Sequence, residues 1–86
     1  MILAYCNEIR KEHDLEPLKK MQKGLKCEGT SCPIANTIRY NSNLDVYVDN
    51  EIVSVNGQEY DLPPGPRRFV DDFDEGKYPQ YDLDIL

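Results

Sequence analysis

The stretch Leu44–Leu62, LDVYVDNEIVSVNGQEYDL, decides the fold of this chain because its apolar residues recur at every second position. A period of two is typical of a β-strand with one buried face. The dipeptide Asn56-Gly57 is one that a type I′ hairpin turn favours, since both of its residues need positive φ. With a second turn at Asp49-Asn50, the stretch predicts a three-stranded antiparallel meander.

The turns also predict the register of the strands. A turn at residues 56 and 57 places Val55 opposite Gln58 and Val53 opposite Tyr60, and a turn at residues 49 and 50 places Val46 opposite Val53. These side chains then share one face, which we expect to be the core. The other face is half polar and is expected to be wet; it carries Tyr47, Ile52, Glu59 and Asp61.

Working outward toward the N-terminus, residues 1–41 are predicted to be helical. The first helix is expected from Ile2 to Glu12, because its stripe residues recur at helical spacing: Ile2, Cys6, Ile9 and His13. Glu16 and Pro17 are typical of a helix start, and they open a short second helix that ends at Gly24. A third helix is predicted from Cys32 or Pro33 to about Asn41.

On the C-terminal side, the run Pro63-Pro64-Gly65-Pro66 stops the sheet and opens a fourth helix over 66–76. Its inward stripe is predicted to be Pro66, Phe69, Val70 and Phe73. The remaining residues, 78–86, alternate apolar with acidic positions. They are read equally well as a final edge strand or as a tail that docks on something else.

Together these patterns predict a single α+β domain over residues 1–86. A meander at 44–62 is packed on one face by three N-terminal helices and one C-terminal helix. The chain has 86 residues and a net charge of −6, which argues against broad nucleic-acid binding. We expect a cytoplasmic protein without a membrane span, since no long apolar run or secretory signal is visible.

Three cysteines and one histidine raise the question of metal or thiol chemistry. Cys6, His13, Cys27 and Cys32 are the candidate zinc ligands, but Cys6 and His13 lie two turns apart on one helix, which is unfavourable for one tetrahedral ion. No metal or other cofactor is therefore predicted. Cys32 is the best nucleophile candidate, because a thiol at a helix N-cap has a lowered pKa, and Cys27 is its candidate resolving partner.

Charge is distributed unevenly along the chain. Residues 1–43 carry a net charge of +2 and residues 44–86 a net charge of −8. The basic cluster lies on the second predicted helix and comprises Lys19, Lys20, Lys23 and Lys26. An ordinary solvated helix face is the favoured reading, and a regulator that uses this helix to contact nucleic acid is the alternative.

The acidic half ends in a predicted partner-binding surface. Its residues are Asp71, Asp72, Asp74 and Glu75, with exposed Tyr78 and Tyr81 beside them. Carboxylates at a helix C-terminus oppose the helix dipole, and a mixed acidic and aromatic patch suits a basic protein partner.

The order of segments resembles small uncharacterised proteins of actinobacteria and their phages. The resemblance covers about residues 32–79 and rests on Cys32-Pro33-Ile34-Ala35, the Leu62-Pro63-Pro64 exit, and the segment from Phe69-Val70 to Tyr78-Pro79. It implies a common fold and a phage origin, hence a host-cytoplasmic location, but no catalytic site.

The sequence as a whole favours a non-enzymatic protein-binding module that modulates a host or cellular protein. It offers no nucleophile with an adjacent base and no phosphate-binding loop, and His13 is the only histidine. The alternatives are a nucleic-acid-linked regulator that uses the lysine-rich helix and a thiol or zinc protein centred on Cys27 and Cys32. Oligomeric state is not predicted.

Overall fold

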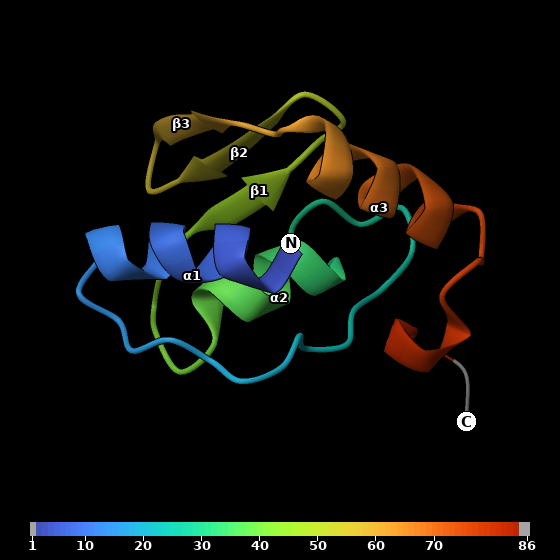
Figure 1. Cartoon of the computed structure of the whole chain (residues 1–86), viewed down its shortest axis with the longest axis horizontal. Coiled ribbons are helices and arrows are strands. Elements are labelled where there is room, and N and C mark those ends of the chain that lie inside the picture. The colour runs from blue at the N-terminus through green and yellow to red at the C-terminus, as the bar shows by residue number, and fades with distance from the viewer. Residues whose placement is uncertain (1, 85–86) are drawn as a thin grey trace.

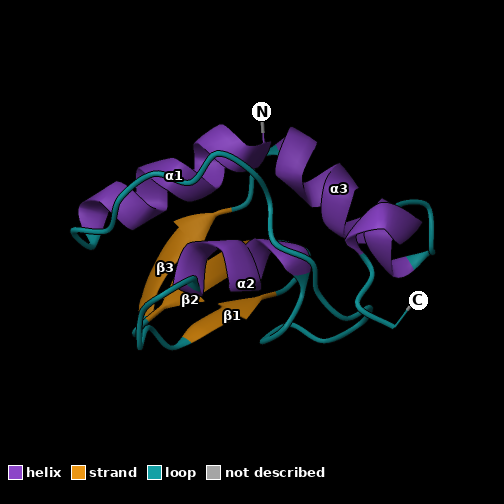
Figure 2. Ribbon diagram, turned by 90° about the horizontal axis from the view of Figure 1, so that it is seen from below, coloured by secondary structure: helices purple, strands orange, loops and turns teal. Residues whose placement is uncertain are grey.

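The computed structural model describes residues 2–84 and shows an α+β fold, in which helices pack on a three-stranded antiparallel sheet (Figure 1). The regular elements are α1 (Ile2–Glu12), α2 (Pro33–Arg39), β1 (Val46–Val48), β2 (Ile52–Val55), β3 (Gln58–Asp61), α3 (Pro64–Asp74) and a 3₁₀ turn over Pro79–Tyr81. Helix α2 covers one face of the sheet with α1 beside it, and α3 continues from the end of β3 (Figures 1 and 2).

The strands follow the order β1-β2-β3, as the meander requires. In the second hairpin Val55 pairs with Gln58 and Val53 with Tyr60, which confirms the predicted register. Asn56 and Gly57 have φ values of 50° and 86°, as a type I′ turn needs.

The first hairpin has a different register from the predicted one. Val46 lies opposite Val55, and Val53 lies opposite Val48. The connection is longer than two residues because Asp49 Oδ1 accepts hydrogen bonds from the backbone N–H groups of Glu51 and Ile52. A shift of two residues keeps every side chain on its face, so the predicted core face is still correct.

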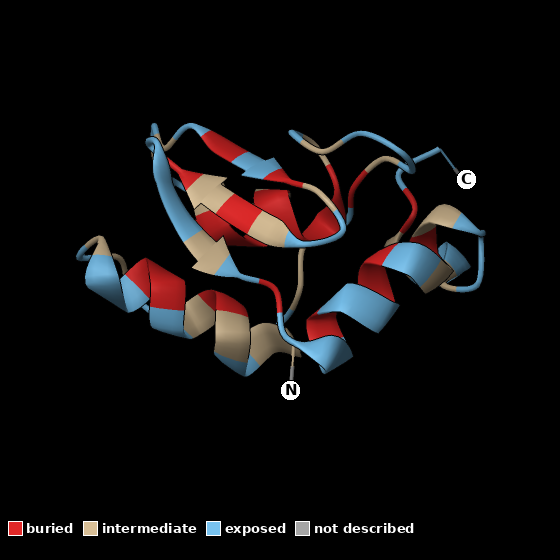
Figure 3. Ribbon diagram, turned by 90° about the horizontal axis from the view of Figure 1, so that it is seen from above, coloured by how far each residue is buried: buried red, intermediate tan, exposed pale blue. Residues whose placement is uncertain are grey.

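The core lies between the sheet and the helices (Figure 3). The predicted strand valines and the α3 stripe are buried, and the N-terminal stripe contributes Cys6 and Ile9. The buried apolar residues are Cys6, Ile9, Cys32, Ile34, Ala35, Ile38, Val46, Val48, Val53, Val55, Leu62, Phe69, Val70 and Phe73.

The predicted second helix is absent, so the expectation of three N-terminal helices is wrong: the described residues form three α-helices in all. Residues 15–25 instead form an irregular segment that we call the strap. Side chains of the flanking helices bind its backbone: Asn7 exchanges two hydrogen bonds with Leu18, at 3.0 and 2.9 Å. Gln22 N donates to Thr37 Oγ1 at 2.9 Å. These bonds satisfy backbone groups that a helix would otherwise pair.

A buried arginine joins α1 to α2. Arg10 is 3% exposed, and its Nη1 donates to the carbonyl oxygens of Thr37, Ile38 and Tyr40 at 3.2, 3.0 and 2.9 Å. Its Nε donates to Glu16 O at 2.9 Å. Burial lowers the pKa of Arg10, but the guanidinium remains a cation and pairs with carbonyl oxygens at the end of α2, of which Thr37 O also accepts from Tyr40 N.

Helix α3 begins two residues before the predicted start and ends at Asp74. Gly76 has a φ of 85° and donates to Phe73 O, while Lys77 N donates to Asp72 O at 3.0 Å. These two bonds form a Schellman cap, in which glycine adopts the left-handed conformation without a steric penalty.

The C-terminal segment docks on the strap of its own chain rather than forming an edge strand. After the 3₁₀ turn, Gly24 N donates to Tyr81 O at 2.8 Å and Leu83 N donates to Gly24 O at 2.9 Å. A single parallel bridge joins Gly24 and Asp82. Residues 85 and 86 of the predicted tail lie outside the described residues.

Candidate functional site

The four carboxylates predicted to contact a partner lie at the end of α3, and we call them the acidic ridge: Asp71, Asp72, Asp74 and Glu75. Asp71 and Glu75 are exposed and stand one helical turn apart, so they project from the same side. Asp72 and Asp74 are partly buried.

Neighbouring groups hold the acidic ridge in place. Asp74 Oδ1 accepts a hydrogen bond from Cys27 N at 2.8 Å. Lys77 Nζ lies 3.4 Å from Asp72 Oδ1 and 3.3 Å from Glu75 Oε1. Asp74 therefore contributes to the fold, and Asp71 and Glu75 are the members best placed to contact a partner.

Tyr78 and Tyr81 are not the exposed side chains that the sequence predicted. Both are partly buried, and their ring centroids lie 5.0 and 5.8 Å from that of Phe69. The 3₁₀ turn folds the chain back so that the rings cover Phe69. Their burial of aromatic surface stabilises the end of α3 and leaves only part of each ring for a partner.

The candidate zinc ligands are not brought together. Cys6 is buried and Cys27 is exposed, while His13 Nε2 lies 3.1 Å from Tyr60 Oη. Over residues 2–84, no cluster of three or more Cys, His, Asp or Glu side chains is arranged to hold a metal ion.

Cys32 is the N-cap of α2, as predicted, and its Sγ accepts a hydrogen bond from Ala35 N at 3.4 Å. The expected lowering of its pKa is nevertheless wrong. Burial raises the pKa of Cys32 more than the backbone N–H groups of Ala35 and Ile34 lower it. Cys27 and Cys32 both line a small cavity of about 170 Å³, but only Cys27 is exposed.

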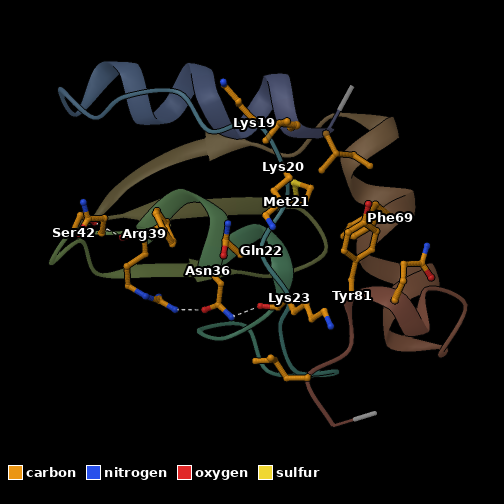
Figure 4. A pocket seen from close by; sticks show the side chains of 16 residues that line it. Lys19, Lys20, Met21, Gln22, Lys23, Asn36, Arg39, Ser42, Phe69 and Tyr81 are labelled. Atoms are coloured by element: carbon orange, nitrogen blue, oxygen red, sulfur yellow. Dashed lines mark hydrogen bonds between the residues drawn. The ribbon is translucent and has the colours of Figure 1, made fainter. Parts of the chain in front are cut away.

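The strap lysines line a much larger depression, which we call the groove (Figure 4). Its volume is about 1120 Å³, and it lies between the strap, α2, the start of α1 and the Phe69 side of α3. Lys19, Lys20 and Lys23 reach it from irregular backbone, so the predicted lysine-rich helix is wrong. Lys26 does not line the groove and lies 3.6 Å from the buried carboxylate of Asp82.

Neither the groove nor the buried Arg10 was predicted from the sequence. The groove draws its lining from five separate stretches of the chain, among them those of Ile2, Met21, Phe69 and Tyr81. Met21 lies in the stretch predicted to form the second helix, which is absent from the structure. Two exposed apolar side chains also line the groove, Tyr40 at 48% and Leu83 at 51%, and they come from distant parts of the sequence.

Comparison with protein-family models, with curated proteins and with solved structures gives no match. The resemblance to actinobacterial and phage proteins therefore stays a prediction. In residues 2–84, no helix combines the length and the apolar character that crossing a membrane requires.

Proposed function

We propose that this protein is a non-enzymatic protein-binding module that modulates a host or cellular partner. The observation that carries the proposal is the separation of charge in the fold: Asp71 and Glu75 project from one side of α3, roughly 200° and 240° around the helix from Phe69, which faces the groove with its lysines. Surfaces of opposite charge that are kept apart favour recognition of charged protein partners.

The acidic ridge is the contact surface that we propose for a basic partner. It is held by the Asp74–Cys27 hydrogen bond, the glycine cap of α3 and the stacking of Tyr78 on Phe69. A surface that is already ordered loses less conformational entropy on binding than a mobile one. A non-enzymatic role is supported by the chemistry available, since His13 is the only histidine and its ring contacts Tyr60.

The test is capture of protein partners by the double variant Asp71→Lys/Glu75→Lys. These residues are exposed, so the variant should fold, and we expect it to lose basic partners that the wild-type chain retains at physiological salt. The matched control is Glu8→Lys/Glu59→Lys, which makes the same charge change at exposed positions on α1 and β3.

The control should retain the partners. If both double variants lose them equally, net charge rather than the acidic ridge causes capture. If neither loses them, the acidic ridge is not the contact surface.

A further inference from the structure

The groove combines an apolar floor with a basic rim. The floor is formed by half-buried Ile2, Leu3, Met21 and Tyr81 together with Phe69. Two of the three exposed large hydrophobic side chains of the described residues, Tyr40 and Leu83, also line it. Exposed apolar surface concentrated in one depression is typical of a binding site.

The rim carries Lys19, Lys20, Lys23 and Arg39, and its lining includes no Asp or Glu. The ion pairs between side chains of residues 2–84 involve Lys26 and Lys77, so none of the four rim cations is paired. The chain has 16 acidic side chains against 10 basic ones. Four unpaired cations at one groove of such an acidic protein favour a negatively charged occupant.

The backbone that presents these cations is fixed. Gln22 N is bound by Thr37 Oγ1, and Lys23 O accepts from Asn36 Nδ2 at 2.8 Å (Figure 4). Arg39 Nη2 donates to Thr30 O at 2.7 Å and also to Asn36 Oδ1, and these bonds hold its guanidinium in place. The site is therefore partly preorganised, which reduces the entropic cost of binding.

The charge and shape of the groove favour one class of occupant. The groove is an open depression of about 1120 Å³, just above the roughly 300–1,000 Å³ range of small-molecule pockets, so its room suits a peptide segment. A nucleic acid presents a dense row of phosphates, which a protein with a net charge of −6 and four rim cations attracts weakly. A short peptide with a few carboxylates and apolar side chains matches both the rim and the floor.

We propose that the groove binds an extended acidic peptide segment of a partner protein, with its carboxylates on the lysines of the strap and its apolar side chains over Met21, Phe69 and Tyr81. This site is separate from the acidic ridge. It binds an acidic ligand, whereas the acidic ridge binds a basic one. The protein would then hold a basic surface at one site and an acidic segment at the other.

A random peptide display library tests the proposal. An extended peptide of about ten residues spans the 32 Å length of the molecule, so peptides of this length are used. We expect the wild-type chain to enrich peptides that combine Asp or Glu with Leu, Ile or Phe. Enrichment without an acidic bias, or no enrichment at all, overturns the proposal.

Two charge-reversal variants locate the site. An enriched peptide, labelled with fluorescein and measured by anisotropy, should bind Lys20→Glu/Lys23→Glu at least about tenfold more weakly than the wild type, a difference of about 1.4 kcal/mol. The matched control Arg67→Glu/Arg68→Glu makes the same change at exposed positions of α3 that do not line the groove. An equal loss in both variants overturns the assignment.

Two further measurements distinguish the occupant. Leu83→Ser, at an exposed floor position, should weaken the enriched peptide but not an all-glutamate peptide of the same length. A labelled oligothymidine that binds the groove more tightly than the enriched peptide would assign the site to nucleic acid instead. Failure of these tests does not affect the proposed role of the acidic ridge. That role is tested by Asp71→Lys/Glu75→Lys, which changes no residue that lines the groove.

Discussion

The meander and the strap are held in place by different forces. The strands bury Val46, Val48, Val53 and Val55 on one face, so burial of apolar surface determines their position. The strap is held through its backbone, by Asn7, Thr37 and Asn36, and its lysines stay exposed. Apolar periodicity thus identifies elements that build a core, whereas in the strap backbone hydrogen bonds to distant side chains replace the helix that the local sequence signals predicted.

The largest expected effect is a loss of stability when a residue of the core that includes the meander valines is truncated. Phe73 is 1% exposed, so Phe73→Ala should reduce the free energy of unfolding by about 3–5 kcal/mol through lost burial and a cavity. In a domain this small the change is a large fraction of total stability. Urea unfolding measures it, with Tyr47→Ala at an exposed strand position as the control. Equal midpoints for the two variants would show that α3 does not pack as described.

Arg10 links the two regions, since it contacts the end of α2 and Glu16 at the start of the strap. Arg10→Met keeps much of the stem but removes the guanidinium donor from Ile38 O and Tyr40 O, and we expect a loss of about 3 kcal/mol. Arg68→Met, at an exposed position, is the control and should change stability by less than about 0.5 kcal/mol. A similar small change in both would mean that water replaces the guanidinium.

Asn7→Ala should release the strap while the core stays folded. The variant loses both hydrogen bonds to Leu18, for an expected cost of about 1–2 kcal/mol. Limited proteolysis with trypsin should then cleave faster at Lys19, Lys20 and Lys23, because local opening exposes these sites. Asn43→Ala, at an exposed position, should leave the cleavage rate unchanged. Cleavage spread evenly over the chain would instead indicate global unfolding.

The last prediction compares the rates at which the cysteines react with a thiol reagent, and it involves no change in stability. A brief pulse of iodoacetamide at neutral pH should label Cys27 first, because its side chain is exposed, and Cys6 last. Burial, with a smaller contribution from Cys32, raises the pKa of Cys6 to about 12, so its thiol stays neutral and unreactive. Mass spectrometry identifies the labelled residue, and all three should react in denaturant. Labelling of Cys6 as fast as Cys27 would contradict the burial of the N-terminal stripe.

The sequence by itself determined α1, the start of α2, the strand faces and the inward stripe of α3. In each case a local cause acts: a helical or strand period, the Asn56-Gly57 turn, or Gly76 after the helix. These causes act over a few residues, so they can be read without knowledge of distant contacts. The acidic residues lie at the end of α3, as the helix pattern predicted, and their role as a contact surface stays a prediction. The use of Asp74 as a hydrogen-bond acceptor for Cys27 was not predicted.

The tertiary structure alone decided the strap, the buried Arg10, the docking of residues 81–83 and the groove. Each depends on partners far away in the chain: Asn7 with Leu18, Arg10 with Ile38, and Gly24 with Leu83. A backbone N–H or carbonyl group must be paired when buried, but the sequence does not show which distant side chain will pair with it. For that reason the strap lysines were predicted on the face of a helix, and only the folded chain places Lys19, Lys20 and Lys23 along the groove.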